Sequence, residues 1–321
     1  MPLVNVPASD ELPHAVGSES GWSESYSFQL VEPREGIALL TRIGVRPNEG
    51  IMDVGLDVYL PDGGMLAARH VAAASGNTAD LAIEGVRYEL VRPLEEWRVT
   101  YDGPAHSLAS SRDAGRHEAW HGSRLERLSL DLRFVAEAAA AAVEPATARF
   151  GQAGRFTGEV WVSGDSYRLD VPGLREKSWG AAGTEIPRLR RRFWIRFGDE
   201  AALVADRRVT ETTDELTGWM LDGGRVRALE SVALRTETEP DSFFQKSFSL
   251  TARDDAGVDH DLTGEVVHLA PLPTVRGTVR AVVCTSVARF SWRGREGVGI
   301  AEYVHRLDAA GNPLLPVAEW G

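Results

Sequence analysis

The sequence is poor in cysteine, in positive charge and in long apolar runs. Cys284 is the single cysteine among 321 residues, which excludes an internal disulfide and a zinc site built from several thiolates. The formal net charge of −12 argues against nucleic acid and anionic membrane surfaces as partners. No run reaches about 18 apolar residues, the length that predicts a transmembrane segment. Residues 1–11 have no basic region and no apolar run, so we expect no signal peptide and a cytoplasmic protein.

Common cofactor and hydrolase motifs are also missing. No G-x-G-x-x-G segment follows a strand pattern and opens a helix, and no Walker A sequence occurs. The H-E-x-x-H and G-x-S-x-G motifs are absent as well. We therefore expect a protein that uses no cofactor and no metal.

What the sequence does contain is alternation of apolar and polar residues. In 128–134 and again in 193–197, every second residue is apolar and would lie on one face of a strand. Turn sequences rich in Asp, Asn, Gly and Pro separate such runs, as in 61–64 and 310–313. Roughly sixteen candidate strands at this spacing predict an all-β fold of antiparallel barrels or sandwiches with little helix.

Two β halves of about 150 residues each would account for the length, because a closed barrel of that size leaves no free edge. The alanine-rich segment 137–143 favours a short helix, or a turn of helix in a loop between the halves, which Pro145 would end. Both this segment and the Pro172-Gly173 pair qualify as a domain boundary. We place it at the latter, which gives domains 1–172 and 173–321.

The segment 172–180 has the highest density of chemically active side chains. Glu176 lies between Arg175 and Lys177, which would favour its ionised form, whereas burial beside Trp179 would favour the neutral acid that donates a proton. A structural ion pair in a turn is the alternative interpretation. Glu176 and Arg175 are therefore catalytic candidates, and Trp179 is a candidate for lining a ligand pocket.

Two segments near the N-terminus add further candidates. Trp22, Glu24 and Tyr26 alternate, so they share one face of a strand and would frame an apolar ligand if that face lines a barrel. In 41–50, Arg42 would reach an anionic ligand or hold a buried carboxylate, and Glu49 in the following turn is a ligand-binding candidate. The alternative in both cases is an ordinary solvent-exposed face.

Other candidates are more isolated. His117 and His121 would suit a metal only on a helix, and the surrounding 110–123 is typical of a loop, so His121 is retained as an acid–base candidate alone. The arginine-rich run 188–192 resembles a solvated basic face and is too short to indicate nucleic acid. Trp194 follows it in a strand pattern and would offer an aromatic face to a ligand or to a cationic transition state.

Four of these segments, 22–26, 41–50, 175–180 and 299–306, together resemble the tandem lipocalin-like superfamily of carotenoid 1,2-hydratases (hydroxyneurosporene synthases) and AttH-like proteins. The similarity covers almost the whole chain and is greatest to an uncharacterised bacterial branch. One departure stands out, because Lys177 replaces a histidine of the motif and Ala181-Ala182-Gly183 replaces an Arg-Asp-Trp triplet.

The resemblance implies two tandem lipocalin-like barrels side by side, with an apolar pocket in or between them. It also implies a cofactor-independent enzyme that hydrates, cyclises or isomerises a hydrophobic isoprenoid or polyene. Glu176 or Glu24 would then act as general acid, oriented by Arg175 or Arg42, since alkene protonation needs a neutral carboxylic acid in a dry pocket. The alternative function is a non-catalytic carrier or sensor of a lipophilic molecule. The oligomeric state is open, with a homodimer among the options.

Overall fold

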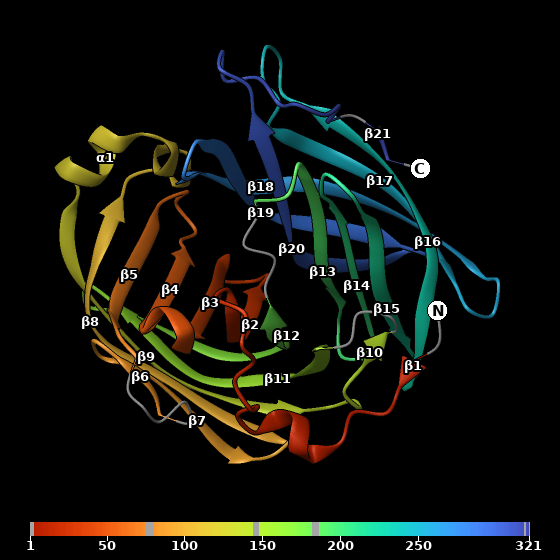
Figure 1. Ribbon diagram of the computed structural model, residues 1–321, viewed down its shortest axis with the longest axis horizontal. Helices are drawn as coiled ribbons and strands as arrows, with labels where there is room; N and C mark the ends of the chain where they lie inside the picture. The colour runs from red at the N-terminus through yellow and green to blue at the C-terminus, as the bar shows by residue number, and fades with distance from the viewer. Residues whose placement is uncertain (1–2, 75–79, 144–147, 182–185, 318, 321) are drawn as a thin grey trace.

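The computed structural model describes residues 3–74, 80–143, 148–181, 186–317 and 319–320. Within these ranges the chain forms two closed antiparallel β-barrels that lie side by side (Figure 1). This architecture confirms the all-β prediction of two tandem lipocalin-like barrels. Of the described helices, none has the length and apolar character needed to cross a membrane.

The first barrel is built from strands of the N-terminal part of the chain. In order of pairing they are β5 (Met65–Ala73), β4 (Ile51–Tyr59), β3 (Ile37–Arg46), β2 (Trp22–Glu32), β12 (Asp165–Ala181), β11 (Arg149–Val162), β9 (Arg124–Ala136) and β8 (Glu96–Leu108). Pairing of β5 with β8 closes the ring, and β7 (Val86–Arg92) and β6 (Leu81–Ile83) extend the sheet past β8. Alternate apolar residues fill the interior, where Phe28 meets Phe134 and Phe156 edge-on.

The second barrel uses the C-terminal part of the chain. Its strands, in order of pairing, are β15 (Asp214–Asp222), β14 (Ala201–Val209), β13 (Leu189–Phe197), β20 (Arg295–Leu307), β19 (Val279–Trp292), β18 (Asp259–Arg276), β17 (Gln245–Asp254) and β16 (Arg225–Thr238). The pairing of β15 with β16 closes this ring, and β21 (Glu319–Trp320) is added along β16. A separate two-stranded ladder joins β1 (Leu3–Val4) to β10 (Ala142–Val143).

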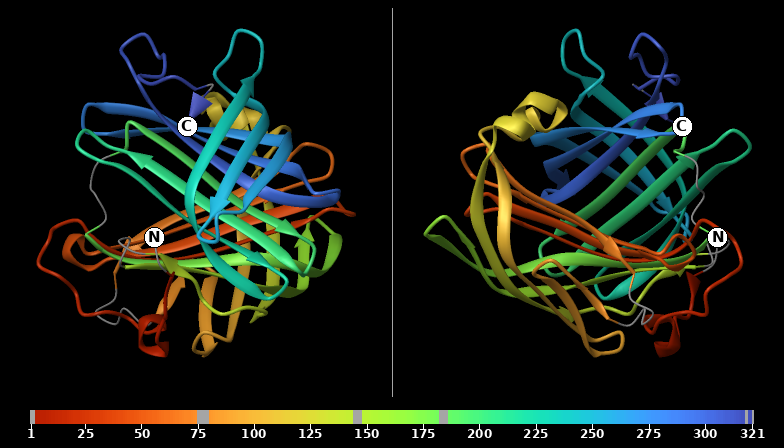
Figure 2. Two further views of the ribbon diagram at one scale, coloured as in Figure 1. Left: turned by 90° about the vertical axis from the view of Figure 1, so that its right-hand side faces the viewer. Right: turned by 60° about the vertical axis from the view of Figure 1, so that its left-hand side comes forward.

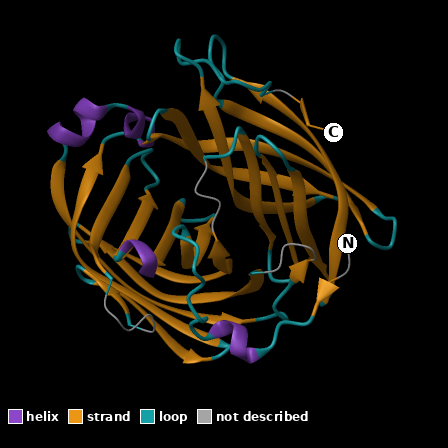
Figure 3. Ribbon diagram, in the orientation of Figure 1, coloured by secondary structure: helices purple, strands orange, loops and turns teal. Residues whose placement is uncertain are grey.

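Helices are few and short in the described residues (Figure 3). They are the 3-10 turns η1 (Ala8–Glu11), η2 (Pro47–Glu49) and η3 (Ser111–Gly115) and the single-turn helix α1 (His117–Gly122). Helix was predicted at 137–143 and a loop at 110–123, and both predictions are wrong. Ala141 instead bridges to Gly151, and Ala142–Val143 form β10. Alanine's helix preference is weak, and pairing with neighbouring strands overrides it here.

The domain boundary expected between residues 172 and 173 falls inside β12, which continues in the first barrel to Ala181. Pro172 is tolerated because it lies one residue before the ladder with β2 begins at Gly173, so its missing N–H interrupts no bond to that strand. At Gly173, a Cβ would come within 2.5 Å of the Phe156 ring, so glycine is needed for close packing. The chain passes to the second barrel between Ala181 and Leu189.

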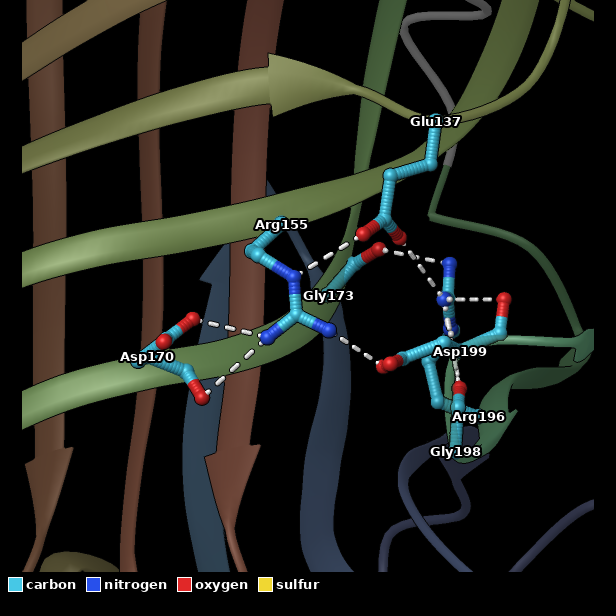
Figure 4. A network of polar contacts seen from close by, with 7 residues as sticks. All are labelled: Glu137, Arg155, Asp170, Gly173, Arg196, Gly198 and Asp199. Carbon is cyan, nitrogen blue, oxygen red and sulfur yellow. Dashed lines mark hydrogen bonds and ion pairs between the residues drawn. The ribbon is translucent and has the colours of Figure 1, made fainter.

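The two barrels meet through the outer faces of their sheets (Figure 2). Part of the contact is an apolar cluster that contains Leu174 of β12, Trp194 of β13 and Ile300 of β20. At one end of the contact, Arg196 of the second barrel bonds Glu137 (Nη2 to Oε2, 3.2 Å) and the Gly173 carbonyl (3.4 Å) of the first. Arg155 bridges Glu137 to Asp199 on the β13–β14 turn (Figure 4).

Candidate functional site

The sequence-predicted residues of β12 divide between two environments, because successive side chains of a strand point to opposite faces. Arg175 and Lys177 lie opposite Phe28 and Tyr26 of β2 and share their face, the barrel interior. Glu176 lies opposite Ser27 and faces outward, toward the second barrel. The predicted candidates therefore form two groups rather than one site.

The outward group borders a cleft of about 510 Å³ between the barrels, which we call the inter-barrel cleft. Its walls come from β2 and β12 on one side and from β13, β14 and β20 on the other, strands that Figure 1 shows next to one another. Polar side chains dominate the lining: Ser23, Ser25, Ser27, Gln29, Arg42, Arg149, Glu176, Ser178, Arg190, Arg192, Asp206, Arg208, Glu215, Thr217 and Glu302. The apolar part of the lining consists of Leu40, Ala148, Trp179, Ala181, Pro187, Trp194 and Val304.

A buried ion-pair network lies at one wall of the cleft. Asp206 accepts two hydrogen bonds from Arg190, at 2.9 and 2.6 Å, and one from Arg149 at 2.6 Å. Glu176 is paired with Arg192, and the Arg149 Nε lies 3.6 Å from its Oε1. Arg192 also approaches Asp206 at 3.3 Å, so three arginines enclose two carboxylates.

This network keeps both carboxylates ionised. Burial would raise the pKa of Glu176, but the guanidinium groups of Arg192 and Arg149 outweigh it and hold that pKa below its ordinary value. For Asp206, the effect of burial is likewise outweighed, by Arg190 and Arg192, and its pKa lies well below the usual range. Of the two alternatives considered for Glu176, this supports the ionised form, through arginines of other strands rather than through Arg175 and Lys177.

A row of hydroxyls faces the arginines. Ser23, Ser25 and Ser27 occupy alternate positions of β2, on the face opposite to Glu24 and Tyr26. Ser25 and Ser178 of β12 are joined by a hydrogen bond of 3.0 Å between their hydroxyl oxygens. Serine hydroxyls both donate and accept, so this wall can bind oxygen atoms of a ligand in either role.

Trp194 adds an aromatic surface to the cleft. The Arg192 guanidinium lies 4.2 Å from the centre of its ring, a cation–π contact. Its indole Nε1 is buried and has no hydrogen-bond partner among the described residues. The combination of guanidinium groups, hydroxyls and an indole suits a small molecule with an oxygen-bearing end and an apolar body.

The inward group of candidates closes one end of the first barrel. Glu24 is buried, with its Oε1 2.8 Å from the Lys177 Nζ and 2.9 Å from the His14 Nδ1. Lys177 also donates to the backbone carbonyls of Asp10 and Leu12, at 2.6 and 2.7 Å. These bonds hold the N-terminal segment across the barrel end.

Arg175 completes this closure. Its two Nη atoms donate to the two carboxylate oxygens of Glu11, at 2.8 and 2.6 Å, and its Nε donates to Gln152 at 2.9 Å. Tyr26 is buried beneath Lys177, whose Nζ lies 5.1 Å from the ring centre, and burial raises the pKa of this phenol above its ordinary value. Trp179 stacks on His14 with ring centroids 4.0 Å apart.

In this group Glu24, Arg175, Tyr26 and the buried Trp22 make contacts within the protein itself. Trp179 also reaches the edge of the inter-barrel cleft. The inward candidates thus form a sealed polar layer at the barrel end rather than an apolar pocket.

The remaining candidates are dispersed. Arg42 lies at the cleft edge, exposed and bonded to Asp53 at 2.9 Å. Glu49 lies in η2, outside the cleft lining. Its Oε2 is 3.3 Å from the Arg46 Nη1, and its Oε1 is 4.0 Å from the Nη2 of Arg276 in the second barrel. His121 is on α1, with its Nε2 3.2 Å from that of His117. No group of three or more His, Cys, Asp or Glu residues that could hold a metal occurs in the described ranges.

Of the residues that make the cleft polar, Arg190 and Arg192 were interpreted from the sequence as part of a solvated basic face, whereas Arg149, Asp206 and the serines of β2 were missed. A signal was present in two places. The arginines at 190 and 192 occupy alternate positions, which places both on one face of β13. The serines at 23, 25 and 27 alternate in the same way, but the sequence interpretation assigned the site to the opposite face of β2, which carries Glu24.

Comparisons with known proteins agree with this architecture. A family model for a domain of unknown function, DUF7064, matches residues 7–306. By sequence, no curated protein matches the chain. Among solved structures, the AttH-like protein NE1406 of Nitrosomonas europaea aligns with a TM-score of 0.61 at 10% identity, over 88% of this chain and 91% of that one.

Two further structures are similar. CghA, solved with Sch210972, has a TM-score of 0.57 at 11% identity, over 89% of this chain and 88% of its own. Kievitone hydratase from Nectria haematococca has a TM-score of 0.57 at 12% identity, over 94% and 93%. At these identities the likeness shows the fold alone, which this chain shares with an AttH-like protein, CghA and kievitone hydratase. The chain belongs to the DUF7064 family, whose two barrels here have the tandem lipocalin-like arrangement of the AttH-like proteins.

Proposed function

We propose that the protein is an enzyme that binds a small molecule in the inter-barrel cleft and adds water to it, removes water from it, or closes a ring. The observation that carries the proposal is the ionised Glu176 beside Arg192 and Arg149, in a cleft of about 510 Å³ faced by serine hydroxyls. A volume of this size suits a substrate of ordinary metabolite dimensions. A hydratase of the same fold supports the reaction class.

The charge in the cleft favours one kind of substrate. Three guanidinium groups and a row of hydroxyls donate hydrogen bonds, so a carbonyl or carboxylate oxygen of the substrate would be held there. Trp194 and Val304 would contact its apolar part. A hydrophobic molecule with a carbon–carbon double bond conjugated to a carbonyl group meets both requirements.

The mechanism follows from these groups. Arg190 and Arg192 would stabilise the negative charge that develops on the carbonyl oxygen as water adds to the conjugated double bond. Glu176, being ionised, would accept the proton of the attacking water, and the neutral acid so formed would return that proton to the carbon next to the carbonyl, which completes the addition and restores the carboxylate. Removal of water is the same sequence reversed.

Protonation of an isolated alkene receives less support. That step needs a neutral carboxylic acid, whereas the pKa of Glu176 lies below its ordinary value and Glu24 is paired with Lys177 away from the cleft. An isoprenoid substrate, independence from cofactors, a homodimer and a cytoplasmic location stay predictions from the sequence.

The test is turnover of amphipathic α,β-unsaturated ketones and acids in ¹⁸O-labelled water, followed by mass spectrometry. Wild-type protein should add labelled water to at least one compound, and Glu176→Gln should lower the rate at least 100-fold. Glu159→Gln, on the outside of the first barrel, is the matched control and should keep the wild-type rate. Equal rates in Glu176→Gln and wild type would contradict the assignment.

A carrier of such a molecule is the second candidate function. It is favoured by the pairing of Glu176 and Asp206 with arginines, which leaves neither of these two carboxylates free. A carrier would release the bound compound unchanged, and Glu176→Gln would alter affinity without any product in either protein. Mass spectrometry of the released ligand distinguishes the two functions.

A further inference from the structure

The second barrel encloses a buried arginine whose charge is not balanced. Arg191 of β13 points into the barrel and is 1% exposed. Its Nη1 donates to the carbonyl of Arg190 at 2.9 Å, and its guanidinium lies 4.0 Å from the centre of the Tyr303 ring. Its Nη2 is buried without a hydrogen-bond partner, and no described carboxylate forms an ion pair with it. A buried charge without a counter-ion is costly, so this arrangement needs an explanation.

The first barrel shows what is missing. Arg175 is buried in that interior to a similar extent, at 2% exposed, and also lies near aromatic rings. There both Nη atoms bind the carboxylate of Glu11, at 2.8 and 2.6 Å. The N-terminal segment thus supplies a counter-ion to the first barrel. In the part of the second barrel that the structure describes, nothing takes the place of Glu11.

The groups around Arg191 supply no negative charge. His305 of β20 is 2% exposed, and burial, reinforced by Arg191, lowers its pKa to about 2, so its ring is neutral. Burial raises the pKa of the Cys284 thiol to about 12 and raises that of the Tyr303 phenol as well, so both stay protonated. Arg207, opposite Arg191 on β14, adds a second positive charge while paired with Asp214.

A second buried group lacks a partner beside this charge. The Nε2 of His305 is buried and unbonded, and a neutral imidazole can carry its proton on that atom. Phe243, in the loop between β16 and β17, lies against the His305 ring with centroids 5.4 Å apart, so apolar groups cover the region. Gln245 is held by its donation to the Cys284 carbonyl at 3.0 Å and adds no charge.

We propose that the interior of the second barrel binds a small monovalent anion such as chloride, with Arg191 as its counter-charge and His305 as a second hydrogen-bond donor. The anion takes the role that Glu11 has in the first barrel. Because Arg191 and His305 are almost completely buried, the site can hold only a small anion. The anion enters when the second barrel opens locally near these two side chains. This site is separate from the inter-barrel cleft, which lies on the other face of β13.

The test is thermal unfolding of the full chain at constant ionic strength, with chloride replacing gluconate, an anion too large for the site. The unfolding temperature of wild-type protein should rise with the logarithm of chloride concentration, since each tenfold increase above Kd shifts the unfolding equilibrium tenfold. Arg191→Met should show no such rise. Arg235→Gln, an exposed arginine of the same barrel, is the matched control and should keep the wild-type slope. A flat wild-type response, or equal slopes in Arg191→Met and wild type, would overturn the proposal.

Two further measurements do not depend on the folding of Arg191→Met. Crystals grown in bromide should show an anomalous peak within hydrogen-bond distance of the Arg191 Nη2, and a map without that peak counts against the site. Cys284→Asp should supply an internal carboxylate near Arg191 and abolish the chloride dependence. If the chloride slope of Cys284→Asp equals that of wild type, the anion binds elsewhere.

Discussion

Glu176 and Lys177 are neighbours in the chain, yet they serve different parts of the molecule. Glu176 faces the inter-barrel cleft and pairs with Arg192 of the second barrel. Lys177 faces the interior of the first barrel and holds Glu24 together with two backbone carbonyls of the N-terminal segment. One strand thereby links the closure of a barrel to the wall of the candidate site, and substitutions at adjacent positions should have separable effects.

Lys177→Met should destabilise the first barrel and leave the cleft intact. It would leave Glu24 buried without its ammonium partner, with only His14 and the Tyr26 hydroxyl beside it, which costs about 3–5 kcal/mol for a broken buried pair. The measurement is the free energy of unfolding in urea, together with the rate of proteolysis of residues 7–21. Ser178→Ala, the next position on the opposite face, should cost less than about 1 kcal/mol. Equal stability of Lys177→Met and wild type would show that Lys177 does not hold the segment.

Asp206→Asn should destabilise the barrel contact, because it removes the carboxylate that Arg149 and Arg190 share. We expect a loss of about 3–5 kcal/mol at neutral pH. The pKa of Asp206 is lowered in the fold, so its contribution is complete above the unfolded value of 3.8 and declines as pH falls below it. The deficit of Asp206→Asn should therefore be constant above about pH 5 and shrink at lower pH. Asp214→Asn, in an exposed pair with Arg207, should cost less than about 1 kcal/mol.

The fold was predictable from the sequence because a two-residue period is a local property. Apolar positions in 128–134 and 193–197 alternate, and both segments are strands with those residues inside. The domain boundary was harder, since Pro172 and Gly173 have the composition of a turn. They continue a strand because Pro172 needs no N–H bond to β2 and Gly173 makes room for Phe156.

The candidate site was predictable only in part. Burial of Glu24 could be inferred from its alternation with Trp22 and Tyr26, burial of Glu176 was one of two alternatives, and both side chains are buried. Their partners could not, because Arg192 and His14 reach them from other strands and loops. Sequence patterns report which face a side chain occupies, whereas pairing across a barrel contact depends on how two sheets are oriented.

Arg196 and Glu137 should couple the two barrels energetically. Arg196 is almost fully buried, whereas Glu137 is half-buried. The energy of this ion pair should therefore lie between that of an exposed pair and that of a buried one. A double-mutant cycle of Arg196→Met and Glu137→Gln should give a coupling of about 1–2 kcal/mol. Calorimetry of Arg196→Met should also show broader unfolding as the barrels lose cooperativity. Arg168→Gln, in an exposed pair with Glu159, should leave the transition unchanged. A coupling near zero would mean that the Arg196–Glu137 pair does not help to join the barrels.

His305 should make the protein less stable as the pH falls below about 6.5. Burial and the neighbouring Arg191 lower its pKa to about 2 in the fold, so between these values the unfolded chain binds a proton that the folded chain does not. The free energy of unfolding should then fall by about 1.4 kcal/mol per pH unit from this group alone. His305→Gln should show a correspondingly smaller slope between pH 6.5 and 4.5 at fixed chloride concentration, measured by urea unfolding. Val267→Thr, at an exposed position of the same barrel, should keep the wild-type slope. If His305→Gln and wild type share one slope, His305 takes up its proton without unfolding, and the barrel end must open to water more readily than its burial indicates.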